Sequence, residues 1–159
     1  MGLFSFIKDA GENQIVQNIN NATALEKTDK NPKTEPISER IRKTIEHYKL
    51  SVDNLKITID EDMAVVCGKV SDQSTKEKVV LIIGNTAGIA SVDDQMIVDH
   101  AENESQFHCV EKDETLSTIA KHYYRDSQKH LLILEANAPM LKNTESIYPG
   151  QVLRIPNLE

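Results

Sequence analysis

The sequence predicts an α+β protein of two small domains, preceded by a short helix. Two observations lead to this prediction. Segments whose apolar residues have helical spacing are interspersed with segments whose apolar residues have strand spacing. The polar stretch 101–106 divides these segments into two groups. A chain of 159 residues is long enough for one ordinary domain or for two small ones. It contains no run of roughly 18 apolar residues, so we expect no membrane span.

Residues 1–11 are expected to form an N-terminal helix that packs on the domain that follows. Gly11 is a natural stop for such a helix, and residues 12–36 then turn polar and contain two prolines, which indicates a linker or long loop. One face of the helix would be apolar, because four residues follow the i, i+3, i+4, i+7 spacing: Leu3, Phe6, Ile7 and Ala10.

Residues 37–100 read as a first domain of order α-β-β-α-β. A helix follows Ser38, and a second helix begins at Ser71-Asp72 and carries an apolar side up to Ile83. Alternating apolar residues or apolar runs predict three strands, at 55–59, 63–70 and 89–98.

Residues 107–156 follow the linker 101–106 and read as a second domain of order β-α-α-β. A short strand starts at Phe107, and a helix follows with Asp113 or Thr115 as its cap. A second helix at 131–136 and a closing strand at 152–155 complete the order. About 50 residues bury little core alone, so we expect this domain to dock on the first one.

Charge and cysteine content narrow the class of protein. The net charge is -7 and no Lys/Arg cluster is present, which argues against a nucleic-acid partner. The N-terminus lacks the pattern of a secretory signal. Cys67 and Cys109 lie in strand-like runs, so two buried reduced thiols are expected. We therefore expect a cytoplasmic monomer.

No residue pattern predicts an enzyme. His122 and Asp126 share a helix face but have no third metal ligand at a suitable spacing. His108 and Cys109 are neighbours in a strand, so their side chains point to opposite faces. The sequence has neither a phosphate-binding loop nor a Gly-x-Gly-x-x-Gly pattern.

The second domain resembles a LysM domain. The usual Gly-Asp-Thr before the first helix reads Asp113-Glu114-Thr115 here, and the usual Tyr-Gly after it reads Tyr124-Arg125. Both departures lie in loops that LysM domains commonly use to hold N-acetylglucosamine chains. Four segments carry the resemblance: Phe107–Val110, Thr115–Ala120, Glu135–Asn137 and Ile147–Pro156.

The first domain resembles a BON domain, which has the same α-β-β-α-β order and a glycine after the second strand, read here as Gly68. The whole arrangement adds GLFSFIKDAG at the start and GNTAGIASVDDQ at the last turn of that domain. This combination resembles the family of small cytoplasmic bacterial potassium-binding proteins built from a BON and a LysM domain. The resemblance covers nearly the entire chain apart from residues 12–37.

A physical account of potassium binding stands beside the resemblance. Potassium is large, singly charged and easily dehydrated, and proteins bind it through neutral carbonyl oxygens. The last four carbonyls of a helix lack helical partners and carry partial negative charge. Two expected helix ends, at Ala10-Gly11 and at Gly84 to Gly88, offer such carbonyls. Taken alone, the second of these is more typical of an ordinary helix-to-strand turn than of an ion site, and the family resemblance reverses that order.

The resemblance implies which atoms hold the ion. Asp93 and Asp94 in the following strand would add a favourable field without contacting the potassium ion. The implied ligands are the main-chain oxygens of Ile7, Ala10, Gly84, Thr86 and Ile89.

Three functional hypotheses follow. In the first, the protein is a cytoplasmic potassium sensor in which ion binding locks the N-terminal helix, docks the LysM domain and makes the molecule more compact. In the second, LysM attaches to peptidoglycan in the cell envelope. In the third, a LysM groove near Tyr123-Tyr124 holds a protein partner.

Overall fold

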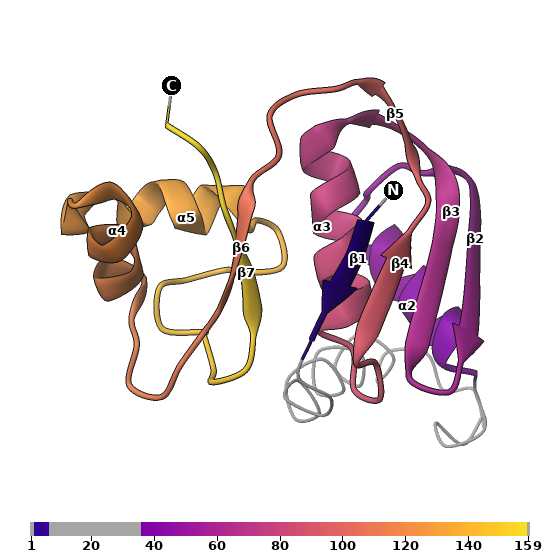
Figure 1. Ribbon diagram of the computed structural model, residues 1–159, viewed down its shortest axis with the longest axis horizontal. Helices are drawn as coiled ribbons and strands as arrows, with labels where there is room; N and C mark the ends of the chain where they lie inside the picture. Colours follow the sequence, from indigo (N-terminus) through magenta and orange to yellow (C-terminus); the bar gives the residue numbers. More distant parts are fainter. Residues whose placement is uncertain (1, 7–35, 159) are drawn as a thin grey trace.

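A computed structural model describes residues 2–6 and 36–158. It confirms an α+β protein of two domains, which lie side by side in Figure 1. The first is a five-stranded sheet covered on one face by two helices, and the second is a two-stranded sheet with two helices. Within the described residues, no helix is both long enough and apolar enough to cross a membrane.

The first domain has the predicted α-β-β-α-β order, with β3 at the centre of its sheet. β3 pairs antiparallel with β2 and parallel with both β4 and β5. The elements are α2 (Ile37–His47), β2 (Asp53–Asp60), β3 (Met63–Asp72), α3 (Gln73–Gly84), β4 (Ser91–Asp94) and β5 (Ile97–His100).

The last predicted strand is two strands in the structure. The break falls at Gln95 and Met96, where the Gln95 N–H donates to the Val66 carbonyl at 2.9 Å and the Met96 N–H donates to Asp94 Oδ1 at 2.9 Å. The Asp94 side chain thus forms a turn with the backbone two residues later, and this turn interrupts the apolar run. The hydrophobicity of the run gives no sign of the interruption.

Helix α3 is the central helix of the molecule. It begins where the sequence predicted, just after Ser71-Asp72, and Asp72 caps it because the Thr75 N–H donates to Asp72 Oδ1 at 2.8 Å. The helix is buried on several sides, since it lies between the sheet and the second domain (Figure 1). Its apolar residues join those of the sheet and α2 in one core.

The predicted N-terminal helix is wrong for residues 2–5, which form strand β1 (Gly2–Ser5). β1 pairs antiparallel with β4 at the edge of the sheet. Phe4 and Phe6 face inward while Leu3 is 68% exposed. Buried and exposed side chains therefore alternate with the period of two of a strand. A short helix is marginal on its own, and the open hydrogen-bonding edge of β4 favours the strand. Residues 7–11 lie outside the described residues.

The second domain has the predicted β-α-α-β order. Thr115, the second of the two expected caps, caps its first helix. A 3-10 turn precedes the second helix. The elements are β6 (Gln106–Cys109), α4 (Leu116–Tyr124), η1 (Ser127–Lys129), α5 (His130–Ala136) and β7 (Val152–Ile155).

The expected burial of the cysteines is wrong for Cys109. Both thiols are free, but Cys109 is exposed and Cys67 is partly exposed. Cys109 ends a strand of a two-stranded sheet, and Cys67 lies on the sheet face that α2 and α3 do not cover. An apolar run therefore identified the strands but not the side of each strand that is buried.

The side chain of Asn137 hydrogen-bonds the backbone of Arg154 at the edge of β7 that does not pair with β6. Its Oδ1 accepts from the Arg154 N–H at 2.8 Å, and its Nδ2 donates to the Arg154 carbonyl at 2.9 Å and to the Ile133 carbonyl at 2.7 Å. The side chain is 2% exposed. It therefore joins α5 to β7 where no third strand is present in the two-stranded sheet.

We expect Asn137→Ala to lower the free energy of unfolding by about 1–3 kcal/mol, because it leaves buried backbone groups of Arg154 without partners. Urea unfolding followed by circular dichroism measures this change. Asn143→Ala is the control, since the exposed Asn143 amide bonds only groups that water can reach. Equal loss in both variants would contradict the assigned role.

Candidate functional site

The candidate site is the turn at residues 84–89, where α3 ends and the chain enters β4. The carbonyls of Leu81, Ile82 and Ile83 accept hydrogen bonds from the residues that follow the helix. Within the described residues, no donor reaches the carbonyl oxygens of Gly84 or Ile89. Among the described residues, these two oxygens are therefore left for a ligand.

The turn itself is held by its own hydrogen bonds. Thr86 is buried, and its Oγ1 donates to the Ile82 carbonyl at 2.7 Å. The Ile89 N–H donates to the Thr86 carbonyl at 3.2 Å, which leaves that oxygen one further lone pair. Gly88 has φ +93°, a conformation that glycine adopts at little cost.

Three of the five predicted ligand residues thus belong to this one turn: Gly84, Thr86 and Ile89. The other two, Ile7 and Ala10, lie outside the described residues. Whether the five carbonyls converge on one ion stays a prediction.

The N-terminal segment reaches the turn through Phe6. The Phe6 ring is buried against Gly84, and a Cβ added at Gly84 would overlap the ring. The Phe6 N–H also donates to the Ala90 carbonyl at 2.8 Å. The segment therefore packs beside the turn as expected, although residues 2–5 do so as a strand.

The two aspartates after the turn are already bonded. Asp94 is 1% exposed and pairs with Lys76, its Oδ2 lying 3.2 Å from Lys76 Nζ. Asp93 Oδ2 accepts from Gln95 Nε2 at 2.9 Å on the opposite sheet face. The Lys76 charge offsets that of Asp94, so the expected field at the turn is weakened.

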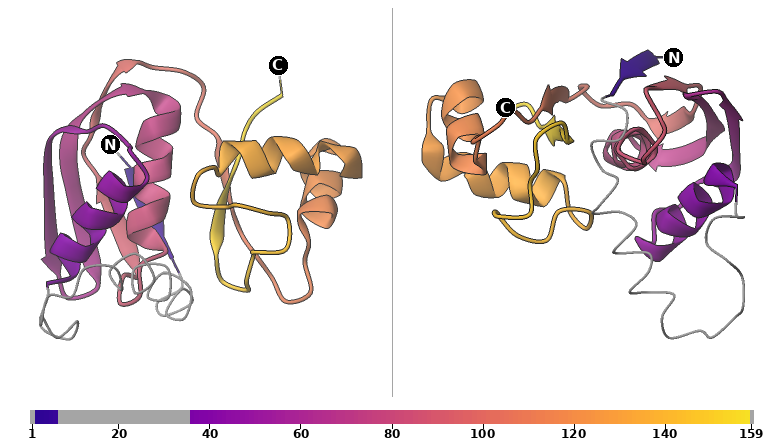
Figure 2. Two further views of the ribbon diagram at one scale, coloured as in Figure 1. Left: turned by 180° about the vertical axis from the view of Figure 1, so that it is seen from behind. Right: turned by 90° about the horizontal axis from the view of Figure 1, so that it is seen from below.

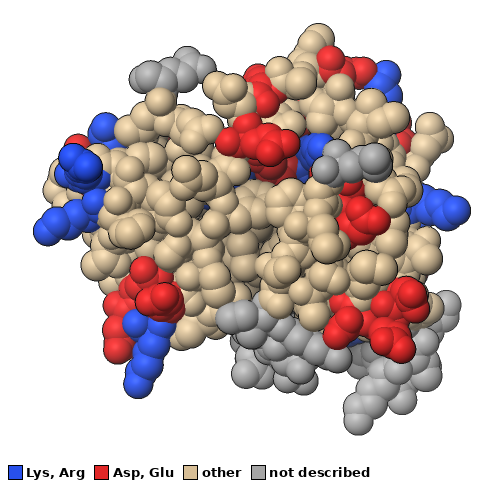
Figure 3. Space-filling view, in the orientation of Figure 1, with Lys and Arg blue, Asp and Glu red and all other residues tan. Residues whose placement is uncertain are grey.

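Carboxylates do not gather into a metal centre. Within residues 2–6 and 36–158, no group of three or more His, Cys, Asp or Glu side chains is placed to hold a metal ion. On the face shown in Figure 3, Asp and Glu side chains lie in several separate groups. The turn therefore offers neutral oxygens, whereas calcium and magnesium prefer carboxylates.

Asn85, in the middle of the turn, bonds the second domain. Its Nδ2 donates to the Val152 carbonyl at 3.0 Å, and its Oδ1 accepts from the Val152 N–H at 3.0 Å. The sequence reading missed this residue. An asparagine after a helical glycine is typical of a helix end, and no local pattern indicates a partner 67 positions away.

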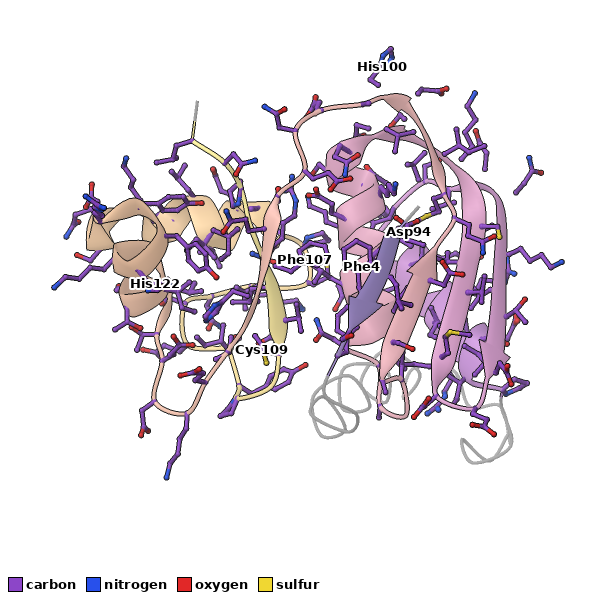
Figure 4. All side chains as sticks on the ribbon, viewed as in Figure 1. Phe4, Asp94, His100, Phe107, Cys109 and His122 are labelled. Carbon is purple, nitrogen blue, oxygen red and sulfur yellow. The ribbon has the colours of Figure 1, made fainter. Side chains whose placement is uncertain are left out.

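Two further contacts hold the domains together. Glu77, 4% exposed, pairs with Arg154 and also accepts from the Ser105 N–H at 2.8 Å. The rings of Phe4 and Phe107 lie 5.0 Å apart between centroids, and Figure 4 shows them facing each other at the junction. The N-terminal strand therefore contacts both domains.

A cavity of about 180 Å³ lies at the same junction. Tyr48 and Asn85 line it from the first domain, and Tyr148 and Met140 line it from the second. Burial, with a smaller contribution from Tyr48, raises the pKa of Tyr148 to about 12. The Tyr148 phenol is therefore neutral at physiological pH.

The loop at residues 113–115, one of the two places where the second domain departs from the LysM pattern, is held by side-chain hydrogen bonds. Glu114 Oε2 lies 2.8 Å from His108 Nε2 and accepts from the Glu111 N–H at 2.7 Å. These bonds, with the charge of His108, outweigh burial and hold the pKa of Glu114 below its usual value. His108 Nδ1 lies 3.0 Å from the Tyr123 hydroxyl. The loop is thus tied to α4.

Comparison with known proteins adds three findings. The BON domain family matches residues 33–100, and the LysM domain family matches residues 108–156. A curated relative from Escherichia coli O6:H1 (strain CFT073), named "Potassium binding protein Kbp", is 41% identical over 156 residues. The match covers 98% of this chain and 99% of the relative.

We expect Gly84→Ala to lower the free energy of unfolding by about 1–3 kcal/mol, because the added methyl group overlaps the Phe6 ring. Without that overlap, alanine within a helix would stabilise by about 1 kcal/mol relative to glycine.

The same substitution in a Phe6→Ala background is the control, measured by urea unfolding. There, Gly84→Ala should be neutral or stabilising. A loss of similar size in both backgrounds would show that Phe6 does not pack on Gly84.

Proposed function

This chain, with its BON and LysM domains, belongs to the family of the potassium binding protein Kbp, and on that premise we propose that it binds potassium at the turn 84–89. The observation that carries the proposal is the end of α3, where the Gly84 and Ile89 carbonyl oxygens accept from no donor within the described residues. The identity of the relative supports the choice of ion.

The chemistry of the turn favours a monovalent cation. Carbonyl oxygens replace the hydration shell of potassium without the cost of burying a full negative charge beside it. The C-terminal end of α3 adds partial negative charge along the helix axis. Calcium and magnesium would lack the carboxylates they prefer.

The N-terminal segment completes the proposed site. Phe6 packs on Gly84 and bonds Ala90, so the chain enters the neighbourhood of the turn just before Ile7. We assign the carbonyls of Ile7 and Ala10 to the ion together with those of Gly84, Thr86 and Ile89. In this proposal the ion joins the N-terminal segment to the end of α3.

Ion binding would also favour the compact arrangement of the domains. The turn is bonded to Val152 through Asn85, and the N-terminal strand contacts Phe107 through Phe4. A ligand shifts a conformational equilibrium only by its differential affinity for the two states. We propose that potassium binds better when the domains are docked, which makes the protein a sensor.

The proposal also covers the class of protein, its location and its oligomeric state. The relative is by its name a binding protein, and we propose binding rather than catalysis here. A cytoplasmic location and a monomeric state belong to the proposal and rest on the sequence alone.

Peptidoglycan attachment is the second candidate, favoured by the LysM match at residues 108–156. The loop bearing Glu114 is tied to His108 in this chain, and we therefore place this function second. A pull-down on purified peptidoglycan tests it: retention of the protein would support attachment, and its recovery in the unbound fraction would exclude it.

We expect KCl to raise the melting temperature above that in NaCl at equal ionic strength. A ligand that binds only the folded state stabilises it by about 2.7 kcal/mol at a concentration 100 times its Kd. Differential scanning calorimetry in the two salts measures the effect. Identical melting curves would show that the protein does not bind potassium selectively.

We expect Gly88→Ala to abolish most of this potassium effect. Among the described residues, an added Cβ meets Ile37 Cδ1 alone, at the ordinary contact distance of 3.6 Å, so the expected damage comes from the φ of +93° that alanine disfavours. Gly150→Ala is the matched control, because Gly150 has φ +87° in a turn of the second domain.

Both variants should lose stability in NaCl by about 1–3 kcal/mol. Only Gly88→Ala should also lose the difference between KCl and NaCl. A full potassium effect in Gly88→Ala would place the ion elsewhere.

A further inference from the structure

We infer that Asn85 lets the docking of the LysM domain set the affinity of the turn for potassium. Asn85 would act as a positioning residue that couples two sites, without contacting the ion through its side chain. This inference rests on the proposed function, and it names the residue through which that function is regulated.

The partner of Asn85 is the edge of β7, where the backbone groups of Val152 need a hydrogen-bond partner. The Val110 N–H donates to the Gln151 carbonyl at 2.8 Å, and in the β6–β7 pair Cys109 lies opposite Val152 and Phe107 opposite Arg154. By alternation along the strand, the backbone polar groups of Val152 and Arg154 therefore point away from β6. Asn137 satisfies those of Arg154 from within the same domain. Asn85 satisfies those of Val152 from the other domain.

Asn85 therefore takes the place of a neighbouring strand. Its amide offers one donor and one acceptor to Val152, with both distances at 3.0 Å. When the domains separate, the Val152 groups lose this partner, and the Asn85 side chain becomes free to rotate. The contact thus exists only in the docked state.

The same residue shares a peptide unit with the Gly84 carbonyl and directly precedes Thr86, so it lies between two of the proposed ligands. The Gly84 carbonyl belongs to the planar peptide that also carries the Asn85 N–H, and the next peptide joins Asn85 to Thr86. The Asn85 N–H donates to the Leu81 carbonyl at 2.9 Å, which fixes the first of these planes. Holding the side chain at Val152 restrains the residue between two ligand carbonyls.

The contact between Glu77 and Arg154 at the junction lacks this connection to the turn. Glu77 lies seven positions before Gly84 on α3, about two helical turns away. Its pairing with Arg154 holds the domains together without touching the turn. Glu77 therefore provides a control that weakens docking but leaves the coupling intact.

The expected coupling is reciprocal. If docking raises the affinity for potassium by some factor, potassium raises the docking equilibrium by the same factor. Couplings of this kind change affinity by about 5–150-fold. Removing the Asn85 amide should reduce both effects together, whereas a contact that only joins the domains would change docking alone.

The test compares Asn85→Ala and Glu77→Gln with the unaltered full-length chain. Asn85 has φ −82° and ψ 0°, which alanine adopts readily, and circular dichroism verifies folding. Isothermal titration with KCl gives the Kd, and small-angle X-ray scattering in KCl and in NaCl gives the radius of gyration. Asn85→Leu, which has a similar size but loses both hydrogen-bonding groups without adding charge, serves as a second variant.

We expect the unaltered chain to contract in KCl. Asn85→Ala should bind potassium at least 5-fold more weakly and show the same radius in both salts, and Asn85→Leu should be weakened in the same direction. Glu77→Gln should be more extended in NaCl and still contract in KCl.

The outcomes separate the inference from the proposed function. If the unaltered chain does not bind potassium, the proposed function is wrong and the inference falls with it. If it binds and contracts but Asn85→Ala contracts equally in KCl, potassium binding stands and the coupling through Asn85 is wrong.

Discussion

The end of helix α3 is the constraint on which the rest of the structure depends. The ring of Phe6 occupies the space that a side chain at residue 84 would need, so the N-terminal strand can pack there only because the residue is glycine. The next residue, Asn85, bonds β7 of the second domain. Two residues thus bring together the sheet edge, the central helix and the second domain.

The proposed cation site does not depend on the net charge of -7 that the chain carries. The oxygens at the turn are neutral, and the nearest buried carboxylate in the strand that follows, Asp94, is paired with Lys76. On the face shown in Figure 3, the acidic side chains lie in separate groups. In the proposed function, the geometry of the carbonyl oxygens gives selectivity for potassium. The signal arises because the bound ion joins the N-terminal segment to the end of α3, which also bonds the second domain.

Much of the fold followed from local sequence patterns, because helix caps and apolar spacing act over a few residues. Asp72 and Thr115 start the helices that the patterns predicted, and β7 has its predicted bounds. The strand at residues 2–5 did not follow, because a free sheet edge supplied by β4 decides its conformation. Of the candidate site, glycine spacing and the family resemblance indicated the turn. Asn85 could not be found this way, since its partner is set by how two domains pack.

The most direct measurement is the carbonyl carbon chemical shift of each residue during a potassium titration, observed by NMR on the ¹³C,¹⁵N-labelled full-length protein. The account predicts saturable shifts at Gly84, Thr86 and Ile89 with KCl, and none of that size with NaCl at equal ionic strength. Unchanged shifts at these three carbonyls, with saturable changes at another part of the chain, would contradict it.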